Sequence, residues 1–112
     1  MSNSHSYNEN KFVKDVTQSV IKMTKTLYQI EIDESSFYFK RYVAHLKELG
    51  KRIYRDKLMP NIDQPFRDMV KSSFPEEYVN AVKIGEDIEK KYSIILTEEE
   101  IIYITAHLLK FI

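Results

Sequence analysis

The sequence predicts an all-α protein, a compact bundle of five helices that forms a symmetric homodimer. Apolar residues recur at spacings of three and four along most of the chain, which is the period of amphipathic helices. The one strand-like stretch, residues 92–96, is too short to build a sheet. Hydrophobic residues make up 43% and charged residues 30% of the 112 residues, a balance typical of a domain with its own core.

The first ten residues are small and polar without any period, so they are expected to form a flexible tail or linker, with His5 inside it. The single domain is expected over residues 11–112. A regular apolar stripe then follows one helix face, which suits lengthwise packing against another helix in the same chain or in a partner. Its residues are Val13, Val16, Val20, Met23, Leu27 and Ile30.

The second helix is expected from Glu34 to about Arg55, with Asp33 as its N-cap and a hydrophobic staple between Ile32 and Phe37. Residues 56–65 hold two of the three prolines and are expected to form a loop, followed by a short third helix around residues 66–70. The apolar arc of the second helix contains Phe39, Tyr42, Val43, Leu46, Leu49, Gly50 and Ile53.

The fourth helix is expected to begin at Pro75, because proline suits the first turn, and to end after Lys90 and Lys91. The last helix opens with a capping box formed by Thr97 and Glu100. A second staple, between Leu96 and Ile101, precedes an inward face made of Ile101, Ile104, Leu108 and Phe111. The buried stripe of the fourth helix is expected at Tyr78, Val82, Gly85, Ile88 and Tyr92.

Composition excludes several classes of function. Seventeen basic and seventeen acidic residues give no net charge, which argues against a nucleic-acid-binding face. The chain has no cysteine, no signal peptide and no apolar run near the roughly 20 residues that cross a membrane. Two glycines cannot supply a glycine-rich nucleotide loop. The sequence therefore predicts a cytoplasmic protein that is not an enzyme, carries no cofactor and binds no membrane.

His45 and His107 are the candidates for chemistry. On a helical wheel, His45 lies about 100° from Leu46, at the edge of the apolar arc, with Arg41 and Arg52 on its outer side. Nearby guanidinium groups disfavour a protonated imidazole and so favour the neutral, nucleophilic ring. The same groups suit a phosphate that is later attached to that ring.

His107 lies about 60° from Ile104, also at a boundary between core and solvent. A packed, hydrogen-bonded structural histidine explains either position and is favoured by geometry alone. A metal site is not expected, because the sequence contains neither His-x-x-x-His nor His-Glu-x-x-His.

Three motifs occur in order along residues 11–112. Residues 41–47 read Arg-Tyr-Val-Ala-His-Leu-Lys, with Arg52 seven residues beyond the histidine. Residues 81–92 contain Ala-Val-Lys-Ile, then Ile-Glu and a closing tyrosine, and residues 99–108 read Glu-Glu-Ile-Ile-Tyr-Ile-Thr-Ala-His-Leu. Together these motifs resemble the PTS regulation domain (PRD) family, in particular the second such domain of BglG/LicT-type transcriptional antiterminators.

This resemblance implies a PRD fold and a regulatory domain that the sugar phosphotransferase system controls by histidine phosphorylation. In the family, HPr typically modifies the second domain and links it to carbon catabolite control, whereas a sugar-specific enzyme II modifies the first; the domains act through dimer rearrangement. Carried over, His45 and His107 are the phosphoacceptors, with Arg41 and Arg52 as supporting groups. RNA is bound by a separate module absent from this chain, so the chain is expected to be a fragment of a longer regulator.

Two alternatives stay open at this point. A histidine phosphotransfer domain of a two-component relay is also a helical bundle, and residues 45–50 are superficially similar to its His-x-Leu-Lys-Gly motif. The glycine is displaced here, and such a domain uses one histidine, which leaves His107 without a purpose. A purely structural dimerisation module would instead use the stripe of the first helix as its interface.

Overall fold

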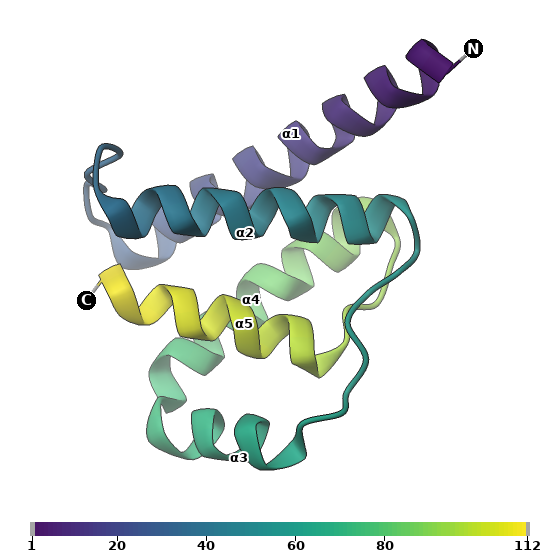
Figure 1. The fold of residues 1–112 in the computed structure, drawn as a ribbon. Helices are drawn as coiled ribbons and strands as arrows, with labels where there is room; N and C mark the ends of the chain where they lie inside the picture. Colours follow the sequence, from purple (N-terminus) through teal and green to yellow (C-terminus); the bar gives the residue numbers. More distant parts are fainter. Residues whose placement is uncertain (1, 112) are drawn as a thin grey trace. The chain divides into compact units, whose positions relative to one another are not determined.

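The computed structural model describes residues 2–111. In chain order the helices are α1 (Ser2–Tyr28), α2 (Phe37–Tyr54), α3 (Gln64–Ser73), α4 (Pro75–Tyr92) and α5 (Glu98–Leu108), and a 3-10 turn, η1 (Leu109–Phe111), follows α5 (Figure 1). No strand occurs in the described residues, and residues 93–97 simply connect α4 to α5. The predicted all-α class with five helices is confirmed.

The chain divides into two compact units, Met1–Lys57 and Leu58–Ile112. The first unit consists of α1 and α2, which pack against each other as a helical hairpin. In the second unit, α5 packs against both α3 and α4. Each unit therefore has a helix that carries one of the two candidate histidines, α2 in the first and α5 in the second.

The N-terminal segment differs from its prediction, because α1 begins at Ser2 and not after a ten-residue tail. No glycine or proline interrupts these polar residues, so nothing stops the helix from extending upstream of its apolar stripe. Glu9 adds a tertiary contact: its carboxylate accepts hydrogen bonds from the Arg55 guanidinium at 2.6 and 3.0 Å. The side chain of His5, like that of Phe111, lies outside the described part of the structure.

The core of the first unit follows the predicted faces of both helices. In α2, all the predicted apolar positions are buried except Val43, which is half-buried. In α1, the predicted stripe is buried only over its first half, at Val13, Val16 and Val20. Met23 and Leu27 are half-buried. Gln29 adopts a left-handed conformation (φ 51°) that terminates the helix, and Ile30 beyond it is 40% exposed.

Two buried threonines let α1 carry polar groups into this core. Thr17 and Thr24 each donate a hydrogen bond to the carbonyl four residues earlier, both at 2.8 Å. The hydroxyls of Thr24 and Tyr42 also share a hydrogen bond of 3.0 Å between α1 and α2. Burial raises the pKa of Tyr42 well above its ordinary value, against the lowering effect of that bond, so the hydroxyl stays protonated.

The start of α2 corrects a second prediction. The N-cap is Ser36 and not Asp33: the Ser36 hydroxyl accepts the Phe39 N–H at 3.1 Å. Asp33 instead accepts the backbone N–H and the hydroxyl of Ser35, at 3.0 and 2.6 Å, which forms a local turn before the helix. The predicted staple between Ile32 and Phe37 is therefore wrong, because it depended on Asp33 as the cap.

The buried face of α4 is rotated from the predicted stripe. Tyr78, Val82 and Tyr92 are only half-buried, so the predicted stripe lies partly at the edge of the core. The start at Pro75, with acidic residues in the first turn and lysines in the last, is confirmed. The buried residues of this helix are Ala81, Ile84, Gly85 and Ile88.

The start of α5 confirms the cap at Thr97, whose hydroxyl accepts the Glu100 N–H at 3.3 Å. The predicted staple also agrees with the packing, since the side chains of Leu96 and Ile101 both cover Gly85 of α4. A Cβ atom at Gly85 would overlap Cδ1 of Ile101. Glycine at this position therefore allows α5 and its connection to approach α4 closely.

Gly50 marks the equivalent close approach in the first unit, where an added Cβ would lie 3.1 Å from Cα of Val13. We expect Gly50→Val to lower the free energy of unfolding by about 1–3 kcal/mol, because the α1 backbone must move to make room. Ala44→Val, on the exposed face of the same helix, controls for helix propensity and should cost only about 0.5 kcal/mol. Urea denaturation followed by circular dichroism measures both, and equal losses would contradict the predicted crowding.

Candidate functional site

His45 lies in the middle of α2 at the boundary that its helical position predicts. It is half-buried, between the exposed Ala44 and the fully buried Leu46. Its Nε2 atom is shielded from solvent. The side chain is therefore partly accessible, but this ring nitrogen is not.

Arg41 and Arg52 occupy the same flank of α2 as His45, because their spacings of four and seven residues correspond to about one and two helical turns. Arg41 is exposed, and its guanidinium carbon lies 5.6 Å from the centroid of the Phe37 ring, one turn further back. Arg52 is half-buried. The register of the helix thus places both arginines on the flank that carries His45, and their role as supporting groups stays a prediction.

A groove of about 580 Å³ lies between α1 and α2, and none of the predicted site residues lines it. His45 therefore lies on a helix flank and not in this groove. The groove is lined by Asn10, Val13, Lys14, Thr17, Gln18, Lys47 and Lys51.

The charge of the chain is divided unevenly between the two units. The first unit has eleven Lys and Arg against seven Asp and Glu, and the second unit has six against ten. The zero net charge of the whole chain conceals this difference. His45 consequently belongs to a unit with excess positive charge, which favours a negatively charged group there.

His107 lies in the last turn of α5, in the second unit. It is half-buried and precedes the fully buried Leu108. The Leu109 N–H that follows the helix donates to the backbone carbonyls of Thr105 and His107. The structure therefore places His107 on a core boundary, as its position on the helical wheel predicts.

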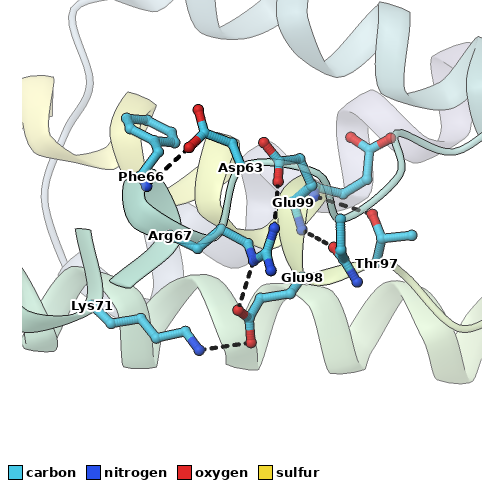
Figure 2. A network of polar contacts seen from close by, with 9 residues as sticks. Asp63, Phe66, Arg67, Lys71, Thr97, Glu98 and Glu99 are labelled. Carbon is cyan, nitrogen blue, oxygen red and sulfur yellow. Dashed lines mark hydrogen bonds and ion pairs between the residues drawn. The ribbon is translucent and has the colours of Figure 1, made fainter. Parts of the chain in front are cut away.

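Ion pairs fix the opposite end of α5 in place (Figure 2). Arg67 of α3 donates to Glu98 through Nε and to Glu99 through Nη1, both at 3.1 Å. Lys71, one turn further along α3, pairs with Glu98 at 2.8 Å. The Arg67 side chain is only 11% exposed and that of Glu99 only 7%, so solvent screens this pair weakly.

The same acidic run holds the segment at the start of the second unit. The buried carboxylate of Glu100 accepts the Met59 N–H at 3.0 Å. In return, the Asn61 side-chain oxygen accepts the Glu99 N–H at 2.8 Å. The sequence pattern assigned Glu100 only to a capping box and gave no role to Arg67, because pairs more than 30 residues apart leave no periodic signal.

The described residues include no group of three or more His, Asp or Glu side chains that is arranged to hold a metal ion. None of the described helices combines the length and the apolar character that a membrane crossing requires.

Comparison with known proteins identifies relatives among transcription regulators. The PRD domain family matches residues 18–111. Transcription antiterminator LicT of Bacillus subtilis (strain 168) is 31% identical over 96 residues, which cover 86% of this chain and 35% of the relative. A beta-glucoside operon antiterminator of Dickeya chrysanthemi is 28% identical over 93 residues, 83% of this chain and 33% of the relative. Protein GlcT of Staphylococcus aureus (strain JH9) is 28% identical over 103 residues, 92% of this chain and 36% of the relative. The chain spans about a third of the length of these relatives.

The ion pair at the start of α5 predicts a dependence of stability on pH. The hydrogen bond from Lys71 lowers the pKa of Glu98, with burial opposing and Arg67 assisting. A lowered pKa in the folded state stabilises the protein above the ordinary pKa of glutamate, and this stabilisation disappears as the pH falls through the folded-state value. We expect Glu98→Gln to cost at most about 1 kcal/mol at pH 7, because a third of the side chain is exposed.

Urea denaturation of both proteins at several pH values checks this dependence. The difference in the free energy of unfolding between wild type and Glu98→Gln should become smaller as the pH drops below about 4. When Lys71 is replaced by Met, Glu98→Gln should lower the free energy of unfolding at pH 7 by less than it does in the wild type, because the main partner of Glu98 is gone. A difference that stays constant with pH would contradict the assigned ion pair.

Proposed function

The chain belongs to the PRD family, and on that premise we propose that it is the regulatory domain of a transcriptional antiterminator, controlled by phosphorylation of His45 and His107. The family match and the antiterminators among its relatives support this proposal. HPr is the proposed phosphodonor, with an enzyme II of the phosphotransferase system as a second one. The domain acts in the cytoplasm as a switch and not as an enzyme, and RNA is bound by a different part of the regulator.

The observation that carries the proposal is the flank of α2 on which His45 lies between Arg41 and Arg52. A phosphoryl group adds about 1.5 to 2 negative charges and three strong acceptor oxygens. Guanidinium groups one turn before and two turns after the histidine are suited to pair with those oxygens. This flank also belongs to the basic unit, so the new charge is compensated locally.

The chemistry needs only a nucleophilic ring nitrogen and a phosphorylated donor. The lone pair of a neutral imidazole nitrogen forms the new N–P bond, while the bond from phosphorus to the nitrogen of a phosphohistidine donor breaks. The electron pair of the broken bond stays with the donor, which leaves as a neutral ring. The phosphoryl group and the positive ring charge pass together to the acceptor histidine.

The burial of Nε2 of His45 couples this chemistry to a change of structure. A phosphoryl group on that atom needs space for three oxygens, and its charge is costly to bury. Phosphorylation of Nε2 therefore favours an arrangement in which this atom is exposed. Such a coupling is typically about 1–3 kcal/mol, which shifts a population about 5- to 150-fold.

We place this rearrangement at a homodimer interface, with His45 and His107 close to it. Each phosphate changes the charge of the surface that it occupies, and a symmetric interface repeats that change on both subunits. A structural dimerisation module with inert histidines is the competing function. Phosphate uptake distinguishes the two.

Phosphorylation is tested with labelled phospho-HPr, with phosphorylated enzyme II as a second donor. We expect acid-labile phosphate on His45, His107 or both, because both lie on partly accessible helix flanks. His45→Ala and His107→Ala should each remove the label at their own position. His5→Ala removes the third histidine of the chain and should leave incorporation unchanged.

The variants also test the competing function. If the histidines are only structural, no phosphate appears on the wild-type protein and the double alanine variant loses thermal stability. If they form a switch, the double variant keeps its helical content and its melting temperature but takes up no phosphate. Circular dichroism and peptide mapping by mass spectrometry separate these results.

Arg52→Ala tests the supporting role of the arginines. In protein phosphorylated on His45, we expect the dimer dissociation constant to change about 5-fold or more, because one arrangement of the interface loses its phosphate partner. Sedimentation equilibrium measures this constant. Arg52→Lys is the matched control, which keeps the charge but not the two-pronged geometry and should have an intermediate effect. An unchanged constant, with phosphate confirmed on His45, removes Arg52 from the mechanism.

A further inference from the structure

Two aromatic rings are exposed at the start of α2. Phe37 is 65% exposed and Tyr38 is 49% exposed, whereas the next residue, Phe39, is buried in the hairpin core. The centroids of the two exposed rings lie 5.8 Å apart in an edge-to-face arrangement. Their side chains therefore leave a pair of apolar surfaces facing solvent.

These rings lie on the flank of α2 that carries His45. Phe37, Arg41 and His45 follow one another at steps of four residues and so form one ridge along the helix. Tyr38 lies seven residues before His45, which is about two turns and nearly the same direction. The guanidinium carbon of Arg41 lies over the Phe37 ring, 5.6 Å from its centroid, and Arg41 is the middle residue of the ridge.

The ridge combines the residue types that dominate protein–protein recognition. Aromatic side chains and arginine are enriched at interface positions that contribute most to binding. Here they are exposed on a helix and within about 12 Å, along its axis, of the proposed phosphoacceptor. Apolar surface and cationic groups occur together, so a matching partner must offer an apolar patch and an anionic group side by side.

We infer that Phe37 and Tyr38 form the docking surface for the protein that donates the phosphoryl group to His45. This inference rests on the proposed function of His45 as an acceptor. The donor protein is the one occupant that brings its own anion to this ridge, because its phosphoryl group must reach His45, one helical turn from Arg41. Its surface beside the phosphorylated residue then covers the two rings.

Docking of the donor and acceptance of the phosphoryl group are therefore functions of different residues of one helix. The rings and Arg41 hold the donor, whereas His45 supplies the nucleophile. A small phosphodonor makes no contact with the rings and needs only the nucleophile. A comparison of phosphoryl transfer from a protein donor and from a small-molecule donor therefore distinguishes a loss of docking from a loss of reactivity at His45.

The experiment compares wild type with Phe37→Ser/Tyr38→Ser, using phospho-HPr and phosphoramidate as the two donors and phosphate on His45 as the readout. We expect kcat/KM for transfer from phospho-HPr to fall at least about tenfold, with an unchanged rate from phosphoramidate. Ile95→Ser removes an apolar side chain that is 84% exposed in the other unit, and it should leave both rates unchanged. Circular dichroism confirms that each variant keeps the helical content of the wild type.

Several results would overturn the inference. An unchanged rate from phospho-HPr shows that the rings do not dock the donor. Equal losses with both donors show that the rings act on His45 itself. Dissociation of the unphosphorylated dimer in the double variant assigns the rings to an interface between copies of the chain. Failure of both donors to phosphorylate His45 in the wild type overturns the proposed function itself, and the docking inference with it.

Discussion

The arrangement of the site depends on one constraint, the burial of a single arc of α2 against α1. Once Tyr42, Leu46 and Leu49 are fully buried, the 100° step of the helix fixes the direction of every other side chain on it. The register of the helix thereby holds His45 and Arg41 on one flank. The close approach at Gly50 and the hydrogen bond between the hydroxyls of Thr24 and Tyr42 stabilise this register from the α1 side. A core that would be needed in any helical hairpin thus also positions the candidate site.

In the second unit, polar contacts position the helix that carries His107. α5 is only 11 residues long, and its first turn is held by charged and polar contacts to α3 and to the segment at residues 59–61. Those contacts are concentrated at the end remote from His107. The polar anchors at one end of α5 and the buried apolar residues Ile102, Ile104 and Leu108 along it fix the orientation of the helix. His107 can then change its charge without breaking the ion pairs that position it.

The sequence predicts most of the fold because helix period and caps are local properties. The five helices, the start at Pro75 and the cap at Thr97 depend on residues within one or two turns, and all are confirmed. Where two local solutions compete, the pattern does not decide between them: Asp33 and Ser36 both suit an N-cap, and the structure uses Ser36 for the helix. Long-range pairs such as Arg67 with Glu99 leave no pattern at all. The boundary positions of both histidines were predictable from the helical wheel, whereas the burial of Nε2 of His45 depends on tertiary packing.

The uneven charge of the two units makes the two proposed phosphorylations physically different events. Phosphate on His45 adds negative charge to a unit with excess lysine and arginine, beside two arginines, so it is compensated where it is formed. Phosphate on His107 adds negative charge to the unit that is already acidic, and at the C-terminal end of α5, where the helix dipole is also negative. The first modification adds attractive contacts and favours order, while the second adds repulsion and favours separation of the surfaces around it. The two proposed modifications therefore bias the domain in opposite directions, and the distribution of charge, more than the identity of the modified side chain, sets the direction.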